Sequence, residues 1–210
     1  VLEDGNTVQP AIDVAFSFSR GKRIVVEEYI VKKHPYLIGG DIFVGDGKVI
    51  MWGLMNCHRD SAVNPLVPVG KSYPLMLGEK DTAAVRTTLQ TIVDKLGIKN
   101  CPMNVELIVD ENGRVFPIDI GPRSGGNMIP DFLSMIFDVD VVEMSVKVTM
   151  GEKIDKTIPV GKPFYATHNL HSNQTGVFQN IKFSDEIEKY IIKKCIYKKS
   201  GDNVEYFDNA

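Results

Sequence analysis

The sequence predicts an α+β fold in which helices pack on an antiparallel sheet. Two dipeptides, Asp46-Gly47 and Asn112-Gly113, are typical of the two-residue turns that join antiparallel strands, because both positions of such turns accept positive φ. Apolar residues recur at helical spacing on one face of residues 81–96, and Gly97 follows as a helix stop. Tight strand pairs together with an amphipathic helix indicate a sheet covered by helices.

The N-terminal third is expected to contain one helix and three strands. Apolar side chains at helical spacing predict a helix over residues 10–18, and a continuous apolar run predicts a buried strand over residues 23–29. The Asp46-Gly47 turn joins strands 36–45 and 48–55, and its register places Asp41 opposite Trp52. Residues 64–74 hold three prolines and a glycine, so we expect a loop there.

The remaining elements follow the 81–96 helix and the second turn. We expect strands over residues 104–110 and 114–121, a helix over 129–137 with Pro130 in its first turn, and a helix over 141–150 before Gly151. Residues 158–163 read as a linker, so the chain divides into a main domain, 1–157, and a small C-terminal α+β extension, 158–210. The extension is expected to contain strands 164–170 and 176–182, a helix over 184–192, and a final pair around Gly201-Asp202.

Composition restricts the function classes. The 210 residues are 43% hydrophobic with a net charge of −3, which is enough apolar material for an enzyme core and argues against nucleic-acid binding. No apolar run is long enough to span a membrane, and no signal peptide is visible. Three cysteines without Cys-x-x-Cys spacing predict reduced thiols and a cytoplasmic location. Cys57 and His58 are adjacent on a strand and point to opposite faces, which argues against a nucleophile–base pair.

The second predicted hairpin places two carboxylates together. With Asn112 and Gly113 as the loop, Glu106 faces Asp119, and the other face pairs apolar residues: Val105 with Ile120, Leu107 with Ile118, and Val109 with Phe116. Like charges that lie directly opposite are destabilising, and a divalent cation would compensate them. Mg²⁺ typically binds one or two carboxylates together with phosphate oxygens. The alternative is an exposed hairpin with two solvated acids.

The residues after Asp119 favour the metal interpretation. Arg123 offers a planar cationic fork suited to phosphate or carboxylate. Gly125-Gly126-Asn127 then leads into the 129–137 helix, and a glycine-rich bend at a helix start can present backbone N–H groups to an anion. Two acids, an arginine and a glycine-rich bend thus converge at one end of the hairpin.

These residues resemble the C-terminal signature of the ATP-grasp superfamily, in which an acid on one strand is followed by Glu-x-Asn-x-Arg on the next. Asp119 stands where the signature has Glu, and Gly121 stands where it has a metal-binding Asn. The resemblance implies that Glu106 and Asp119 hold Mg²⁺, with Mn²⁺ as an alternative ion, and that Arg123 steadies the transferred phosphate. Asn127, a phosphate oxygen or water would fill the place of the absent Asn.

A second stretch is similar to the ATP-grasp adenine hinge. Glu27, Glu28, Tyr29 and Ile30 match its Glu-Glu-Phe-Ile pattern, whose backbone binds the adenine edge of ATP. The resemblance makes Asp41 the candidate for the acid that binds the ribose. The alternative is that Glu27 and Glu28 close a strand in solvent.

The resemblance covers about residues 7–151, the C-terminal half of a grasp fold. The Lys-bearing strand and glycine-rich loop of the superfamily have no match, so we expect a fragment that needs its N-terminal region, and the isolated fragment is expected to be inactive. The residues from 158 onward loosely resemble the carbamoyl-phosphate-synthase-like group.

The implied function is a carboxylate–amine ligase with small-molecule substrates, working through an acyl-phosphate. A non-catalytic nucleotide-binding or interaction domain is the alternative, and a metal hydrolase using Glu106 and Asp119 is a third. Neither a nucleic-acid nor a membrane partner is expected, and a homo-oligomer is left open.

Overall fold

A six-stranded antiparallel sheet organises the protein. The computed structural model describes residues 7–60, 64–154 and 158–207. The sheet has the order β5-β4-β1-β2-β3-β6, and its members are β1 (Leu37–Gly45), β2 (Lys48–Asp60), β3 (Asn64–Tyr73), β4 (Cys101–Val109), β5 (Val115–Gly121) and β6 (Tyr165–His168). The described helices are α1 (Val8–Phe18), α2 (Glu79–Leu96), α3 (Ile129–Phe137), α4 (Val141–Thr149) and α5 (Asp185–Glu188). The predicted α+β class is therefore confirmed.

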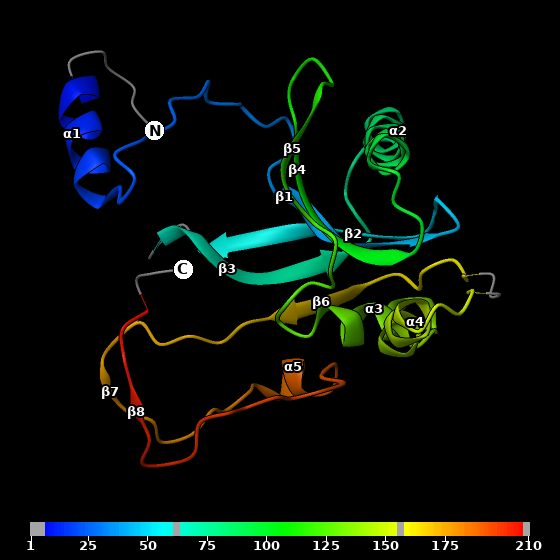
Figure 1. Ribbon diagram of the computed structural model, residues 1–210. Coiled ribbons are helices and arrows are strands. Elements are labelled where there is room, and N and C mark those ends of the chain that lie inside the picture. The colour runs from blue at the N-terminus through cyan, green and yellow to red at the C-terminus, as the bar shows by residue number, and fades with distance from the viewer. Residues whose placement is uncertain (1–6, 61–63, 155–157, 208–210) are drawn as a thin grey trace.

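The two faces of the sheet are covered by different helices (Figure 1). On one face, Val85, Leu89 and Val93 of α2 pack against alternate residues of β1 and β4. On the other face, α3 and α4 pack against Phe43, Met51 and Met55. Because successive strand residues alternate between faces, β1 and β2 contribute to both cores. α1 has no buried residue and lies apart from the sheet.

The first hairpin confirms its predicted turn and corrects its register. Asp46 and Gly47 both have positive φ, as the two-residue turn requires. A bulge between Phe43 and Val44 then shifts the pairing by one residue, so that Asp41 lies opposite Gly53 and not opposite Trp52. A bulge adds an unpaired residue that the turn dipeptide alone does not reveal.

The second hairpin keeps its predicted pairing only at its acidic part. Glu106 pairs with Asp119 and Val105 with Ile120, as predicted. Beyond a bulge next to Glu106, Leu107 pairs with Pro117 and Val109 with Val115, so those two predictions are wrong. Of the turn dipeptide, only Gly113 has positive φ. The Asp110 backbone N–H donates to the Arg114 carbonyl, and the Asp110 carbonyl accepts from the Gly113 N–H. The loop is therefore the three-residue kind that ends in a glycine bulge.

Two segments in the N-terminal half were predicted with the wrong secondary structure. Residues 24–31 are not in a strand, and the side chains of Val25 and Val26 are 80% and 78% exposed, because no strand pairs with them in the described part of the chain. Residues 64–73, expected as loop, form β3 between β2 and β6. Pro68 lies at a bulge in the β2 pairing and Pro74 follows the strand, which are the positions where a strand tolerates proline.

The C-terminal part begins inside the main sheet. β6 pairs with β3, so the chain after residue 158 contributes to the six-stranded sheet before it continues to the two-stranded β7 (Gly176–Val177) and β8 (Asn203–Val204). The division at residue 157 stays a prediction. None of the helices in the described part of the chain has the length and apolar character needed to span a bilayer.

Candidate functional site

The acid pair lies on the sheet face that α3 covers. Glu106 and Asp119 are direct Cα partners on β4 and β5, so their side chains leave the sheet on the same side. The Glu106 side chain is 28% exposed, and Asp119 is exposed. The sequence-derived pairing of these two carboxylates is thus confirmed.

Two cations from β2 and β3 share this face, and the sequence did not reveal them. Arg59 Nη2 lies 3.2 Å from Glu106 Oε1 and forms an ion pair with it. Lys71 Nζ lies 3.0 Å from Cys57 Sγ, its cross-strand neighbour. Both cations fall outside the sheet as it was expected from sequence, because Arg59 follows the predicted end of the second strand and Lys71 lies in the segment expected as loop. Their place in the site became visible only from the β2–β3 pairing.

A glycine makes room for the Lys71 side chain at the middle of the sheet. A Cβ atom on Gly39 would lie 2.7 Å from Cys57 Sγ and 3.4 Å from Lys71 Nζ. Gly39 is also the β1 partner of Glu106. The ammonium group of Lys71 therefore lies over β1, and β1 is the strand that pairs with β4, which carries Glu106.

Asp41 holds the glycine-rich bend in place. Its fully buried carboxylate accepts hydrogen bonds from Asn104 Nδ2 and from the Gly125 backbone N–H, both at 2.8 Å. Burial raises the pKa of Asp41 above its ordinary value, while these two hydrogen bonds and the charges of Lys71 and Arg123 oppose the rise. The ribose role of Asp41 stays a prediction, and the structure gives both of its oxygens partners within the chain.

The bend carries the remaining predicted residues past the end of β5. The Arg123 carbonyl accepts a hydrogen bond from the Asn104 backbone, and Arg123 Nη1 donates to the Ser124 carbonyl at 3.0 Å. Asn127 has a φ of 51° and lines a small cavity together with Glu106. The structure thus places Asp119 and Asn127 beside Glu106, while the Arg123 side chain is turned to the Ser124 carbonyl.

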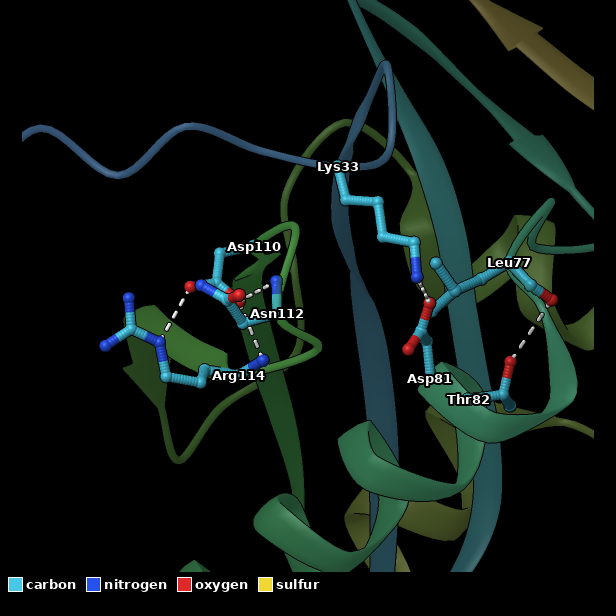
Figure 2. A network of polar contacts seen from close by, with 7 residues as sticks. All are labelled: Lys33, Leu77, Asp81, Thr82, Asp110, Asn112 and Arg114. Carbon is cyan, nitrogen blue, oxygen red and sulfur yellow. Dashed lines mark hydrogen bonds and ion pairs between the residues drawn. The ribbon is translucent and has the colours of Figure 1, made fainter.

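The predicted adenine hinge lies apart from this region, on the chain that leads into β1. After Glu27–Ile30, Lys32 bridges to Asp110 and the Lys33 backbone donates to the Val109 carbonyl. Figure 2 shows Lys33 reaching across to Asp81 at the start of α2, with the two side chains 2.8 Å apart, and Asp110 bonded to Arg114 and Asn112. The chain is therefore anchored just after the predicted hinge, and the hinge role of residues 27–30 stays a prediction.

The carboxylate of Asp110 is bound by residues of its own hairpin turn. Burial alone would raise the pKa of Asp110, but hydrogen bonds from Arg114 and Asn112 and the charge of Arg114 outweigh it and hold the pKa below its ordinary value. The carboxylate accepts from Arg114 Nε at 2.7 Å.

One cavity adjoins Glu106, and a second, larger cavity lies next to the first. The smaller has a volume of about 30 Å³, room for about two water molecules, and its polar lining includes Arg59, Lys71 and Glu106. The larger has a volume of about 670 Å³ and lies between this region and the C-terminal residues. Pro68, Asn127 and Asn169 line both cavities, so the two are neighbours.

The donor set fits Mg²⁺ bound together with phosphate. Within residues 7–60, 64–154 and 158–207, no group of three or more His, Cys, Asp or Glu side chains could hold a metal ion. A closed all-protein site is therefore not formed by the described residues. Two carboxylates with space for phosphate and water are what Mg²⁺ commonly uses in nucleotide-dependent enzymes.

The chain is similar to proteins of one family. The sequence profile of the ATP-grasp domain matches residues 15–131. Phosphoribosylglycinamide synthetase from Anaerococcus prevotii superposes on 99% of this chain with a TM-score of 0.71 and 18% identity, and L-amino acid ligase from Bacillus licheniformis on 100% with 0.73 and 16%. The biotin carboxylase domain of the Hydrogenobacter thermophilus 2-oxoglutarate carboxylase, crystallised with MgADP, ADP and bicarbonate, superposes on 96% with a TM-score of 0.67 and 15% identity.

These likenesses are matters of fold. The chain spans 53%, 52% and 45% of the lengths of those three structures, respectively. At such identities the shared architecture supports no transfer of substrates.

Proposed function

Because the chain belongs to the ATP-grasp family, we propose that it serves, in its full-length form, as an ATP- and Mg²⁺-dependent ligase that joins a carboxylate to an amine through an acyl-phosphate. The observation that carries the proposal is the direct pairing of Glu106 with Asp119, beside Arg59, Lys71 and the bend that holds Arg123. The two carboxylates there can neutralise a metal ion, and the cationic side chains can neutralise anionic substrates.

The reaction would proceed in two displacements. A carboxylate oxygen of the substrate attacks the γ-phosphorus of ATP, the bond to the β-phosphate oxygen breaks, and ADP leaves. The amine nitrogen then attacks the acyl carbon, the bond to the phosphate oxygen breaks, and the amine gives up one proton as inorganic phosphate leaves. Such chemistry depends on positioning and charge stabilisation more than on a general base.

Each residue then has a stated task. Glu106 and Asp119 would hold Mg²⁺, with Mn²⁺ as an alternative, and the bound ion would neutralise phosphate charge. Arg123 would stabilise charge on the transferred phosphoryl group. The backbone of Glu27–Ile30 would bind the adenine edge, and Asn127 or water would complete the metal coordination in place of the Asn that Gly121 replaces.

Arg59 and Lys71 suit the carboxylate substrate. Both line the small cavity with Glu106, and both lie on the sheet face from which the acid pair projects. A carboxylate placed there would meet two cations and stand next to the metal-bound phosphate. Charge-assisted hydrogen bonds of this kind are about twice as strong as neutral ones.

Calorimetric titration of the full-length protein with MgATP, followed by an ADP-release assay over candidate carboxylates and amines, tests the proposal. Asp119→Ala is expected to abolish turnover and leave the fold intact, whereas Glu111→Ala, in the exposed hairpin loop, is the matched control and should turn over normally. Undiminished turnover in Asp119→Ala would contradict the proposal.

A second candidate is a non-catalytic nucleotide-binding or interaction domain. Gly121 in place of the usual metal-binding Asn favours it. MgATP binding without ADP release on any substrate would support the nucleotide-binding form of this candidate, and absence of MgATP binding would contradict both the ligase and the nucleotide-binding domain.

A further inference from the structure

We propose that the larger cavity binds the amine nucleophile, and that this amine carries its own carboxylate, as an amino acid or short peptide does. The inference rests on the proposed function and assigns its second substrate. The cavity volume, about 670 Å³, falls within the ~300–1,000 Å³ of typical small-molecule sites. The small cavity, at about 30 Å³, has no room for a second substrate.

The position of the large cavity suits attack on an acyl-phosphate formed beside Glu106. Asn127 and Asn169 line both cavities, so a molecule in the larger one borders the space next to the acid pair. A nucleophile must approach within about 3–3.5 Å of the reacting carbon, which only a neighbouring site permits.

The wall of the cavity is tied to the sheet by specific contacts. Asn169 follows β6 and is bound by its backbone N–H to the Val69 carbonyl at 2.8 Å. His171 Nε2 lies 3.0 Å from Asp60 Oδ2 at the end of β2. Phe207, whose backbone N–H donates to the Ser172 carbonyl, also packs its ring 5.7 Å from that of His171. Figure 1 shows the β7–β8 segment running beyond the β6 edge of the sheet.

The chemistry of the lining selects the amine class. Glu205 carries a negative charge and Lys198 a positive one, while Leu170, Val204 and Phe207 supply apolar surface. An ammonium group before it loses its proton is attracted to Glu205, and a carboxylate is attracted to Lys198. Lys198 Nζ donates to the Asn203 carbonyl at 2.8 Å, and a substrate carboxylate would add an acceptor of opposite charge, which a simple alkylamine lacks.

A competition assay on the full-length protein tests the inference. Hydroxylamine traps an acyl-phosphate as a hydroxamate without needing a shaped amine site. With ATP, Mg²⁺ and the carboxylate found by ADP release, L-amino acids and hydroxylamine are supplied together, and the ratio of amide product to hydroxamate is measured. Leu170→Trp, which fills the cavity, should lower this ratio ~10-fold, and Glu205→Gln should lower it ~5-fold.

A third variant tests the assigned class. Lys198→Met should lower the ratio about 5-fold for free L-amino acids and leave it within about twofold for their amides, which lack the carboxylate. Leu96→Trp on the exposed face of α2 and Glu186→Gln on α5 are matched controls and should keep the wild-type ratio.

The outcomes separate the two proposals. If the wild-type protein forms no hydroxamate with any carboxylate, the ligase function is overturned and this inference with it. If hydroxamate forms but the ratio in Leu170→Trp and Glu205→Gln stays within twofold of wild type, the amine site is overturned while the ligase function stands. If Leu170→Trp forms no hydroxamate because it does not fold, Glu205→Gln gives the decision.

Discussion

Glu106 and Asp119 lie directly opposite each other on β4 and β5, and both project from the sheet face that α3 covers. Opposed strand residues have Cβ atoms about 4.5–5.5 Å apart, so the two carboxylates repel each other unless a cation balances them. Arg59 balances Glu106 from one side, through an ion pair of 3.2 Å, while Asp119 is exposed. The pair therefore combines a partly neutralised acid with an accessible one, which suits an ion that arrives with its nucleotide.

The close packing of Gly125 gives a prediction with a built-in control. A Cβ on Gly125 would lie 2.7–2.8 Å from Ile129 Cδ1, Asn104 Nδ2 and Asp41 Oδ1, whereas one on Gly126 would meet nothing within 4 Å. Gly125→Ala should lower the free energy of unfolding by ~1–3 kcal/mol, and Gly126→Ala should change it by about 0.5 kcal/mol or less. Urea denaturation of both variants decides, and equal stability of the two would contradict the described bend.

Asp41 should give the protein a distinctive pH dependence. Its pKa is raised in the folded state above the ordinary 3.8, so the folded protein binds this proton more tightly than the unfolded chain does. The stability that Asp41 contributes therefore falls as pH rises from 3.8 through the folded pKa. The difference in unfolding free energy between wild type and Asp41→Asn, measured by denaturation from pH 4 to 8, should decrease with pH, and an increase would contradict the buried position.

Asp110 should show the opposite sign. Its pKa is held below 3.8 in the folded state, so its stabilising contribution is complete above 3.8 and is lost as pH falls through the folded pKa. The difference between wild type and Asp110→Asn should accordingly shrink on acidification below 3.8. If acid leaves that difference unchanged, the contacts of Asp110 with Arg114 do not stabilise the folded state.

Lys71 should act on the carboxylate substrate. Lys71→Met keeps the stem of the side chain and removes its charge, so KM for the carboxylate should rise ~10–100-fold, because a hydrogen bond to a charged group contributes ~1.5–3 kcal/mol. KM for ATP should change about twofold or less, since the nucleotide is placed by other residues. Lys48→Met is the matched control, because Lys48 lies on β2 with its side chain 72% exposed. Steady-state kinetics that show equal KM values in both variants would remove Lys71 from the site.

Local chemistry predicted part of this structure well. The helix over residues 129–137 has the expected bounds, since Pro130 sets its first turn and an apolar face follows. The Glu106–Asp119 pair was also predicted correctly, because two departures from the expected hairpin cancel. The loop has one residue more than a two-residue turn, and the bulge between the turn and Glu106 restores the predicted register.

The rest depended on long-range pairing. Residues 64–73 form a strand despite their prolines, because β2 and β6 bond to either side and a bulge absorbs Pro68. Arg59 and Lys71 join the site only through that pairing, so no local motif marks them. Conversely, the apolar run at residues 24–26 is not in a strand, and Val25 and Val26 are exposed, because apolar character does not by itself provide a strand partner.

The affinity of the full-length protein for ATP at saturating Mg²⁺ tests the central claim most directly. Calorimetry should show that Asp119→Asn, which keeps the shape of the side chain and removes its charge, weakens binding by about tenfold or more, equivalent to ~1.4 kcal/mol. In EDTA the wild type and the variant should bind ATP equally, because no ion then links the carboxylates to phosphate. Equal affinity of the two proteins with Mg²⁺ present would contradict a shared magnesium site at Glu106 and Asp119.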